Sequence, residues 1–433
     1  MLSAYGTVDT ANKTVTATAV ASDNLSNTTS VQRGTYAQMS TMYADLQTAG
    51  ESAKLDEMRT LYNLSEAGAK EALTTIAGED SIKIVMTGQR SMIADTVVSE
   101  RMDQLTYGSM KSGFADGNAA AEKAARLSSG SSSPYGGFTS TGIIGLYNAG
   151  GAQAMADAQN ASGCDTGYKW IKTTGIFGRP DNDTKYWGGA ASTGYDMPFG
   201  SRLRGGVFVS FGGMYYKSEY SKAQSYDTRL GLYGGNTDNA SRWYAYADYG
   251  WQYTDAKREL ANLGQTARGR FSSHIFEAGG EYTYDVLSLL AADSAWHVSP
   301  LAAVQTSFMI VPGYEESGAG VYSRRLETMK NFYAAGGAGL EVRRDLKAGF
   351  IAVRGEYRRA FSGTEPEADF TYEGDTAHTY TVSSKKDSST VIGGLRGEWE
   401  FTRRWILSGS GSMLKGFDED NSYAATVAVR HLW

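Results

Sequence analysis

Hydrophobic and polar residues alternate along the C-terminal part of the chain, from Tyr168 to the end. The segment RWYAYADYGWQYTDAKREL shows this best, with Trp243 and Ala247 on one side of an extended chain and Tyr244 and Asp248 on the other. Successive side chains of a strand point to opposite faces. The pattern therefore predicts β-strands that have one apolar face and one polar face.

Counting such segments gives about twelve strands, an even number that bacterial membrane barrels use. The predicted strands cover residues 168–178, 185–197, 202–220, 225–236, 242–258, 268–286, 296–311, 324–344, 349–362, 382–401, 404–417 and 421–433. Tight turns such as PFGS, DLKAG and FTRR alternate with longer polar loops, among them residues 363–387. A soluble sandwich also alternates, so the pattern alone does not separate a buried core from a lipid-facing surface.

Aromatic residues favour the lipid-facing interpretation, because membrane barrels carry aromatic girdles at both interfaces. All eight tryptophans stand at position 170 or beyond, many of them near the ends of predicted strands. The candidates for interfacial aromatics are Trp170, Trp243, Trp296 and Trp405. Small and polar residues fill the opposite face, as in ILSGSGSML. We expect an all-β transmembrane barrel of antiparallel strands over residues 168–433, with Ala247 facing lipid and Asp248 facing the interior.

The part of the chain before the barrel divides into three segments by composition. Residues 1–33, rich in Thr, Ser, Asn and Val, predict a strand-like tail that ends something larger. Residues 34–106 show helical spacing, and the stretch SEAGAKEALTTIAG begins at a capping Ser65 and ends at Gly78. Residues 107–167, rich in Gly, Ser and Ala, predict a flexible linker.

Composition excludes several classes of protein. A net charge of -6 without a basic cluster argues against nucleic acid as a partner. The single cysteine, Cys164, excludes an internal disulfide and a cysteine-based metal site. No apolar run approaches the roughly 20 residues of a membrane-spanning helix. The start, MLSAYGTVDTANKTV, does not resemble an export signal, so we expect any such signal to lie upstream.

Four segments carry a family resemblance: GYKWIKTTGIFGR, GYDMPFGSRLRGGVFVSFGGMYY, SYDTRLGLYGG and the closing SYAATVAVRHLW. They resemble the β-domain of a classical monomeric autotransporter, the translocator of type V secretion. The stretch LDEMRTLYNLSEAGAKEALTTIAGE followed by SERMDQL resembles the segment that precedes this domain. The resemblance implies a monomeric barrel in the outer membrane of a Gram-negative bacterium, threaded by a helix, which anchors and exports an N-terminal passenger to the cell surface.

The resemblance also gives the last strand a role. In the family, a terminal aromatic residue with apolar residues at alternate positions before it is read by the barrel assembly machinery. Trp433, Val429 and Val427 match this pattern, while His431 replaces a more usual aromatic or aliphatic residue. A purely structural interpretation stays open, because the same residues are needed to face lipid.

Twelve strands enclose a lumen wide enough for a helix or a narrow water path. The first choice for a segment inside it is residues 81–105, and the second is AGGAQAMADAQNA, nearer the first strand. With the first choice, Arg101 is expected among acidic lumen groups such as Asp227 and Asp248; a solvated surface arginine is the alternative.

Enzymatic signals are weak, since the sequence has no HExxH, GxSxG, Walker or GxGxxG motif. We therefore predict no catalytic, cofactor-binding or metal-binding residues. The acidic stretches PDNDTKY and FDEDNSY lack the spacing of a calcium loop. Two rival functions stay open: a porin, which would have an open lumen, and a barrel enzyme, for which His378 beside Asp375 in a long loop is the candidate.

Overall fold

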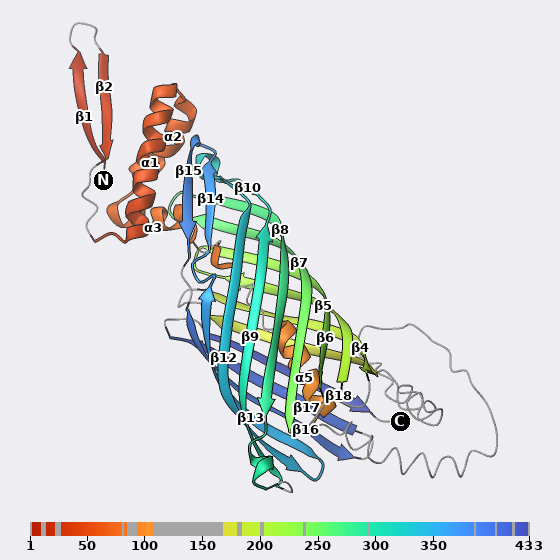
Figure 1. Cartoon of the computed structure of the whole chain (residues 1–433). Helices are drawn as coiled ribbons and strands as arrows, with labels where there is room; N and C mark the ends of the chain where they lie inside the picture. Colours follow the sequence, from red (N-terminus) through yellow and green to blue (C-terminus); the bar gives the residue numbers. More distant parts are fainter. Residues whose placement is uncertain are drawn as a thin grey trace, which may run out of the picture.

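The structure, a computed structural model, describes residues 2–9, 14–21, 27–79, 82–84, 93–106, 168–179, 184–199, 203–236, 240–291, 294–384, 387–402, 405–417 and 421–431. Its main body is a tilted barrel with helices at one end and one helix inside (Figure 1). None of the described helices is long and apolar enough to span a membrane.

Twelve of the described strands form the barrel. They are β3 (Tyr168–Arg179), β4 (Lys185–Phe199), β5 (Leu203–Lys217), β6 (Ser221–Asn236), β7 (Ser241–Leu260), β8 (Gln265–Tyr284), β9 (Trp296–Val311), β12 (Met329–Leu346), β13 (Gly349–Ser362), β16 (Ser389–Thr402), β17 (Trp405–Gly416) and β18 (Asn421–His431). Each pairs antiparallel with the next, and β18 returns to β3, from Asn421 opposite Arg179 to Val427 opposite Thr173. This closed antiparallel barrel confirms the predicted fold, and closure leaves no free edge.

The two faces of the wall follow the predicted alternation. Ala247 is exposed and Asp248 is buried, as the sequence predicts. Large apolar side chains point outward; Leu230, Val304 and Val427 are each more than 60% exposed. Charged side chains such as Arg229 point inward and are buried. Apolar outside and polar inside is the arrangement of a barrel whose outer surface contacts lipid.

The prediction that Trp170 is an interfacial aromatic is wrong, because its side chain points inward and is only 5% exposed. Its indole N–H donates a hydrogen bond of 2.8 Å to the hydroxyl of Tyr233. The neighbouring Ile171, 52% exposed, takes the outward position instead. A buried indole needs an acceptor for its N–H, and the lumen supplies one.

A second, smaller sheet continues the barrel at one end. It consists of β10 (Tyr314–Ser317), β11 (Arg324–Leu326), β14 (Glu367–Tyr372) and β15 (Asp375–Ser383), and it joins the barrel where β10 pairs with β8. The predicted strands 324–344 and 382–401 are therefore wrong at their starts, since residues 324–326 and 382–383 belong to this sheet. We call this end of the barrel the loop end, and the end where β3 begins and β18 finishes the turn end.

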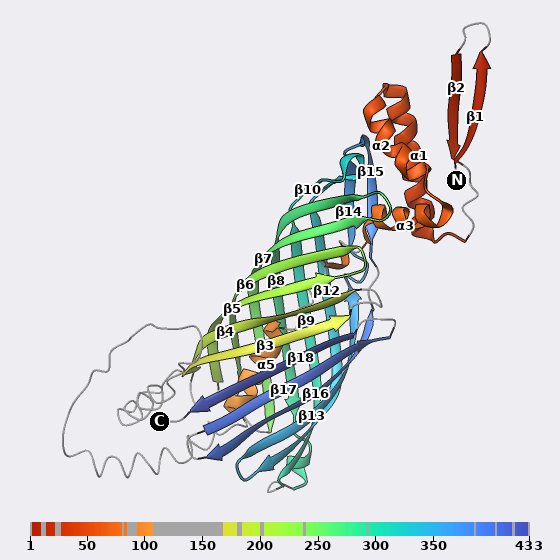
Figure 2. The same cartoon turned by 180° about the vertical axis from the view of Figure 1, so that it is seen from behind.

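Three helices pack against the second sheet and the adjoining ends of barrel strands: α1 (Ser30–Ala49), α2 (Ser52–Tyr62) and α3 (Glu66–Ala77) (Figures 1 and 2). We call α1–α3 the cap. Ser65 caps α3 by accepting a hydrogen bond from the backbone of Gly68, and Gly78 ends it at a φ of 65°, both as predicted. The cap core includes Met42, Leu73 and Ile76, which cluster with residues of the second sheet such as Phe370.

The remaining elements complete the chain. A hairpin of β1 (Leu2–Asp9) and β2 (Thr14–Ala21) precedes α1, so helix begins at residue 30, earlier than the predicted boundary after residue 33. The helix α5 (Ile93–Thr106) lies inside the barrel (Figure 2). Two short 3-10 helices, η1 (Leu287–Leu289) and η2 (Gly320–Tyr322), lie in the connections after β8 and β10. The predicted linker, residues 107–167, lies outside the described residues.

Candidate functional site

The candidate functional site is the barrel lumen and the helix α5 within it. One side of α5 is apolar and buried: Val97, Val98, Met102 and Leu105. These residues form a cluster with the inner wall of β3–β7, which is largely aromatic: Trp170, Tyr186, Phe208, Tyr216, Tyr233, Tyr244 and Tyr246. The helical spacing of the four residues gives α5 a continuous stripe that faces this wall.

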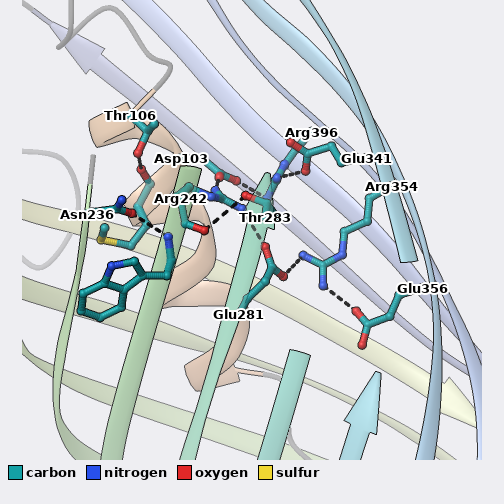
Figure 3. Close-up of polar contacts among 12 residues, drawn as sticks. Asp103, Thr106, Asn236, Arg242, Glu281, Thr283, Glu341, Arg354, Glu356 and Arg396 are labelled. Atoms are coloured by element: carbon teal, nitrogen blue, oxygen red, sulfur yellow. Dashed lines mark hydrogen bonds and ion pairs between the residues drawn. The ribbon is translucent and has the colours of Figure 1, made fainter. Parts of the chain in front are cut away.

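Two acidic side chains of α5 face other parts of the lumen. The Asp103 carboxylate lies between the guanidinium groups of Arg242, from β7, and Arg396, from β16 (Figure 3). Glu100 pairs with Lys172 of β3 and accepts a hydrogen bond from the hydroxyl of Ser410 on β17. Both carboxylates are buried, and a buried charge is tolerated only when it is paired. The pairs fix the height and rotation of α5.

Arg101 lies in the lumen as expected, but with a different partner. Its Nε donates to Asp196 of β4 at 2.8 Å, and Asp196 also accepts from Arg204 at 2.9 Å. Asp227 and Asp248 are held instead by Arg229, a residue of the wall itself, at 3.4 and 3.1 Å. The predicted partners are therefore wrong, because a guanidinium of the wall already pairs with those two carboxylates.

The wall arginines continue the network away from α5 (Figure 3). Arg242 also donates to Glu281 at 2.7 Å, and Arg396 pairs with Glu341. Arg354 bridges Glu281 and Glu356. Each arginine thus keeps a carboxylate of the wall besides any that α5 supplies. This arrangement limits the cost of removing the helix, because each of these three arginines still pairs with an acid of the wall.

Space remains on the polar side of α5. A cavity of about 70 Å³ lies between the helix and strands β13, β16 and β17, lined among others by Ser99, Glu100, Arg354, Gly394 and Arg396. A polar cavity of this size has room for a few water molecules. The lumen is therefore filled by apolar contact on one side of the helix and by charges and open space on the other.

The cap is attached to the loop end by buried ionic groups. Arg258 of β7 donates to the backbone oxygen of Thr75 at 2.8 Å, and Arg324 of β11 to that of Ala77 at 3.0 Å. Glu316 of β10 accepts from both arginines. Burial alone would raise the pKa of Glu316, but the two arginines hold it at about 2. The last carbonyls of α3, which lack helical partners, thus receive cationic donors.

The strand β7 contacts the N-terminal segment twice. Arg242, near its start, pairs with Asp103 of α5, and Arg258, sixteen residues later, binds the end of α3. Sixteen residues of strand extend roughly 50 Å. Ala77 therefore lies at the loop end of the barrel and Asp103 toward its turn end. Between them, the structure describes residues 78–79, 82–84 and 93–102.

The remaining predicted aromatic and terminal residues take these positions. Trp243 and Trp296 point outward and are 40% and 48% exposed. Trp405 begins β17 opposite His431, and Val429 pairs with Leu407. Val427 points outward. Three further sets of residues lie outside the described residues: Trp433, the second-choice segment AGGAQAMADAQNA, and the acidic residues of PDNDTKY and FDEDNSY.

His378 and Asp375 do lie together, but as a link between the cap and the second sheet. The Nδ1 of His378 is 3.3 Å from a carboxylate oxygen of Asp45 on α1 and 3.1 Å from Asp375. Among the described residues these three are the group close enough to share a cation. Asp375 already accepts hydrogen bonds from Tyr380 and from the backbone of Ala377, which accounts for its burial without an ion.

Sequence reasoning missed Arg258, Arg324 and Glu316. Arg324 and Glu316 fall in a connection between barrel strands, and alternation along one strand does not show which distant carbonyl an arginine will bind. One sequence signal for a docking surface was available: the helices α1 and α3 before the barrel are strongly capped, and their apolar sides need a surface to pack on.

Comparison with known proteins gives the family. Residues 169–412 match the family model "Autotransporter beta-domain". Esterase EstA from Pseudomonas aeruginosa and from Pseudomonas putida are each 27% identical over 166 residues, which is 34% of this chain and 24% of theirs. The translocator domain of the autotransporter NalP from Neisseria meningitidis has a similar fold, with a TM-score of 0.50 and 13% identity over 65% of this chain and 94% of that one.

The matched region thus spans about a quarter of the length of the curated relatives. The family model covers more than half of the chain, and the barrel that it matches is the closed one described above. The chain therefore belongs to the autotransporter β-domain family and forms an outer-membrane translocator, with α5 in the lumen of its barrel.

Proposed function

We propose that this translocator carries a passenger, whose last part is the β1–β2 hairpin, to the surface of a Gram-negative cell and then keeps it anchored there. The loop end faces the outside and the turn end faces the periplasm. The observation that supports this most is the double contact of β7, with α3 at one end and α5 near the other. A chain arranged in this way leaves its preceding residues outside the cell.

The terminal strand closes the barrel and also serves as the assembly signal. Trp433, His431, Val429 and Val427 are the residues read by the barrel assembly machinery, and the assembled barrel is a monomer. Deleting Trp433 should lower the amount of heat-modifiable barrel in outer membranes but leave refolding of the purified chain nearly intact. Cutting back to Ala424 should abolish both, because most of the closing strand is then gone and only residues 421–424 of its seam with β3 remain. If deleting Trp433 lowers the amount of membrane-assembled barrel and the refolding yield equally, Trp433 is a structural anchor only.

We propose no enzymatic role for this chain. The name esterase belongs to the two Pseudomonas relatives, of which about a quarter is matched. A porin function is disfavoured by the buried pairs between α5 and the wall, which occupy the lumen.

The function is tested by placing a signal peptide and an epitope tag before Met1 and producing the chain in a Gram-negative host. Protease added to intact cells should remove the tag, while the barrel remains heat-modifiable. The same fusion ending at Ala424 is the control and should show no surface tag. A tag that is cut only after the outer membrane is opened, in cells with an assembled barrel, would contradict the proposal.

A further inference from the structure

The connection between β8 and β9 differs from its neighbours at the turn end. It runs from residue 285 to 295, whereas β12 and β13 are joined by only Lys347 and Ala348. Residues 285–291 of this connection contain η1, and we call them the η1 turn. Three apolar side chains of this turn are exposed: Val286 at 39%, Leu289 at 68% and Leu290 at 86%. Leaving a leucine in water forgoes about 2 kcal/mol of burial.

The η1 turn is held in one conformation. Asp285 is buried, and its carboxylate accepts from the backbone N–H groups of Leu287 at 3.1 Å and Val298 at 3.2 Å. His297 contacts the same carboxylate at 2.6 Å and reaches Asp345 of β12 at 3.1 Å. The leucines are therefore presented by a fixed scaffold.

The exposed residues continue the lipid-facing surface of the barrel. Val286 follows Phe276 and Tyr282, which point outward from β8 at 49% and 48% exposure. Trp296, outward on β9, lies beneath the guanidinium of Arg344 at 5.1 Å. An exposed aromatic and a cation beside apolar side chains is the composition of a membrane interface.

We propose that the η1 turn is an interfacial anchor that inserts Leu289 and Leu290 into the phospholipid surface at the turn end. It fixes the depth of the β8–β9 side of the barrel in the membrane, with Arg344 among the lipid phosphates. The continuity of the turn with the lipid-facing side chains favours lipid over a periplasmic protein as the occupant.

The test uses the full chain with Cys164→Ser, refolded into phosphatidylcholine and phosphatidylglycerol vesicles. A single cysteine at Leu290 carries an environment-sensitive NBD dye. The matched control carries the same dye at Lys347, an exposed residue of the β12–β13 turn at the same rim. We expect a blue-shifted emission at residue 290, severalfold stronger quenching by spin-labelled lipid than at 347, and weaker quenching by aqueous iodide.

Equal iodide quenching at both positions, without quenching by lipid, would overturn the proposal. So would protection of residue 290 that arises only when a periplasmic extract is added, since a protein would then be the occupant. Leu289→Ser in the dye-labelled chain should move the emission at residue 290 toward that of water while the barrel stays heat-modifiable. An unchanged emission would also count against the anchor.

Discussion

The N-terminal segment meets the barrel in two regions that are built differently. The cap packs on the second sheet through an apolar core, with Leu73 and Ile76 buried, and adds only a small ionic cluster at the end of α3. The helix α5 meets the lumen with one apolar side and one side of ion pairs and open space. Ion pairs are replaced by water more easily than apolar contacts, which suits a segment that must enter a pore.

This difference between the two contact regions indicates which part of the N-terminal segment is bound more tightly. The cap needs a dry surface, which exists only after the connections of the loop end have folded. The lumen instead keeps its own charge balance, as Arg242 retains Glu281 and Arg396 retains Glu341 in addition to Asp103. We therefore expect substitutions in the buried cluster under the cap to cost more than those between α5 and the wall.

The largest effect is expected for Glu316→Gln, which removes the carboxylate that pairs with both Arg258 and Arg324. Removing the shared charge partner of two buried arginines should cost about 3–5 kcal/mol of cap docking. Protease resistance of residues 30–77 across a urea titration, in the folded detergent-solubilised chain, measures this. Glu315→Gln is the matched control, since Glu315 and its partner Arg325 are both exposed, and it should cost less than about 1 kcal/mol.

The second-largest effect is the weakening of cap docking at low pH. The pKa of Glu316 is lowered from 4.5 to about 2, so its charge stabilises the docked cap above pH 4.5 and is lost as the pH falls toward 2. Cap docking, measured by the same proteolysis, should be unchanged from pH 8 to 5 and weaken below 4.5. The difference between the wild type and Glu316→Gln isolates this group, and it should shrink toward zero near pH 2. A difference that stays constant would contradict the assignment.

A smaller effect is expected inside the barrel. Asp103→Asn removes the charge that α5 offers to Arg242 and Arg396, but each arginine keeps a wall carboxylate. The loss should be about 1–3 kcal/mol, a range typical of a weakened buried hydrogen bond. This weaker binding of α5 should give faster protease cleavage near residue 106 and larger fluctuations of the current through planar bilayers. If Asp103→Asn lost more free energy than Glu316→Gln, the contact of α5 with the wall would be the more sensitive one, contrary to this comparison.

The smallest effect probes the open space beside α5. Gly394 lines the cavity, and a Cβ there would meet no atom closer than 3.8 Å. We expect Gly394→Leu to fill part of this space. We expect a modest fall in residual conductance and no change in stability. Gly355→Leu on the neighbouring strand is the control, because Gly355 is exposed on the outer face and has nothing within 4 Å of a Cβ. Equal conductance of the two variants would place the ion path elsewhere.

The barrel was predictable from sequence because strand alternation is local. The faces of Ala247 and Asp248 and the limits of β9 and β13 follow directly from the pattern. Trp170 was assigned to the wrong face because one aromatic near a strand end satisfies either the interface or a lumen acceptor such as Tyr233. The register of the neighbouring strands decides between them, and a single strand does not contain it.

The contents of the lumen were harder to predict. That Arg101 enters the barrel follows from its place near the end of the helical segment. Its partner does not, because Asp196, Asp227 and Asp248 are all inward acids, and only the three-dimensional wall shows that Arg229 already holds two of them. The second sheet was missed because strands β10 and β11, of four and three residues, are too short to show a period.

The central claim is that one continuous segment lies outside the cell at the cap and inside the lumen at α5. It is tested by single cysteines in a Cys164→Ser chain, labelled on intact cells with a membrane-impermeant maleimide. Thr60→Cys, on the exposed side of α2, should label, whereas Ser99→Cys, buried beside the lumen cavity, should label only after the barrel is unfolded by heat. Labelling of Thr60→Cys only after the outer membrane is opened, or equally fast labelling of both, would contradict the account.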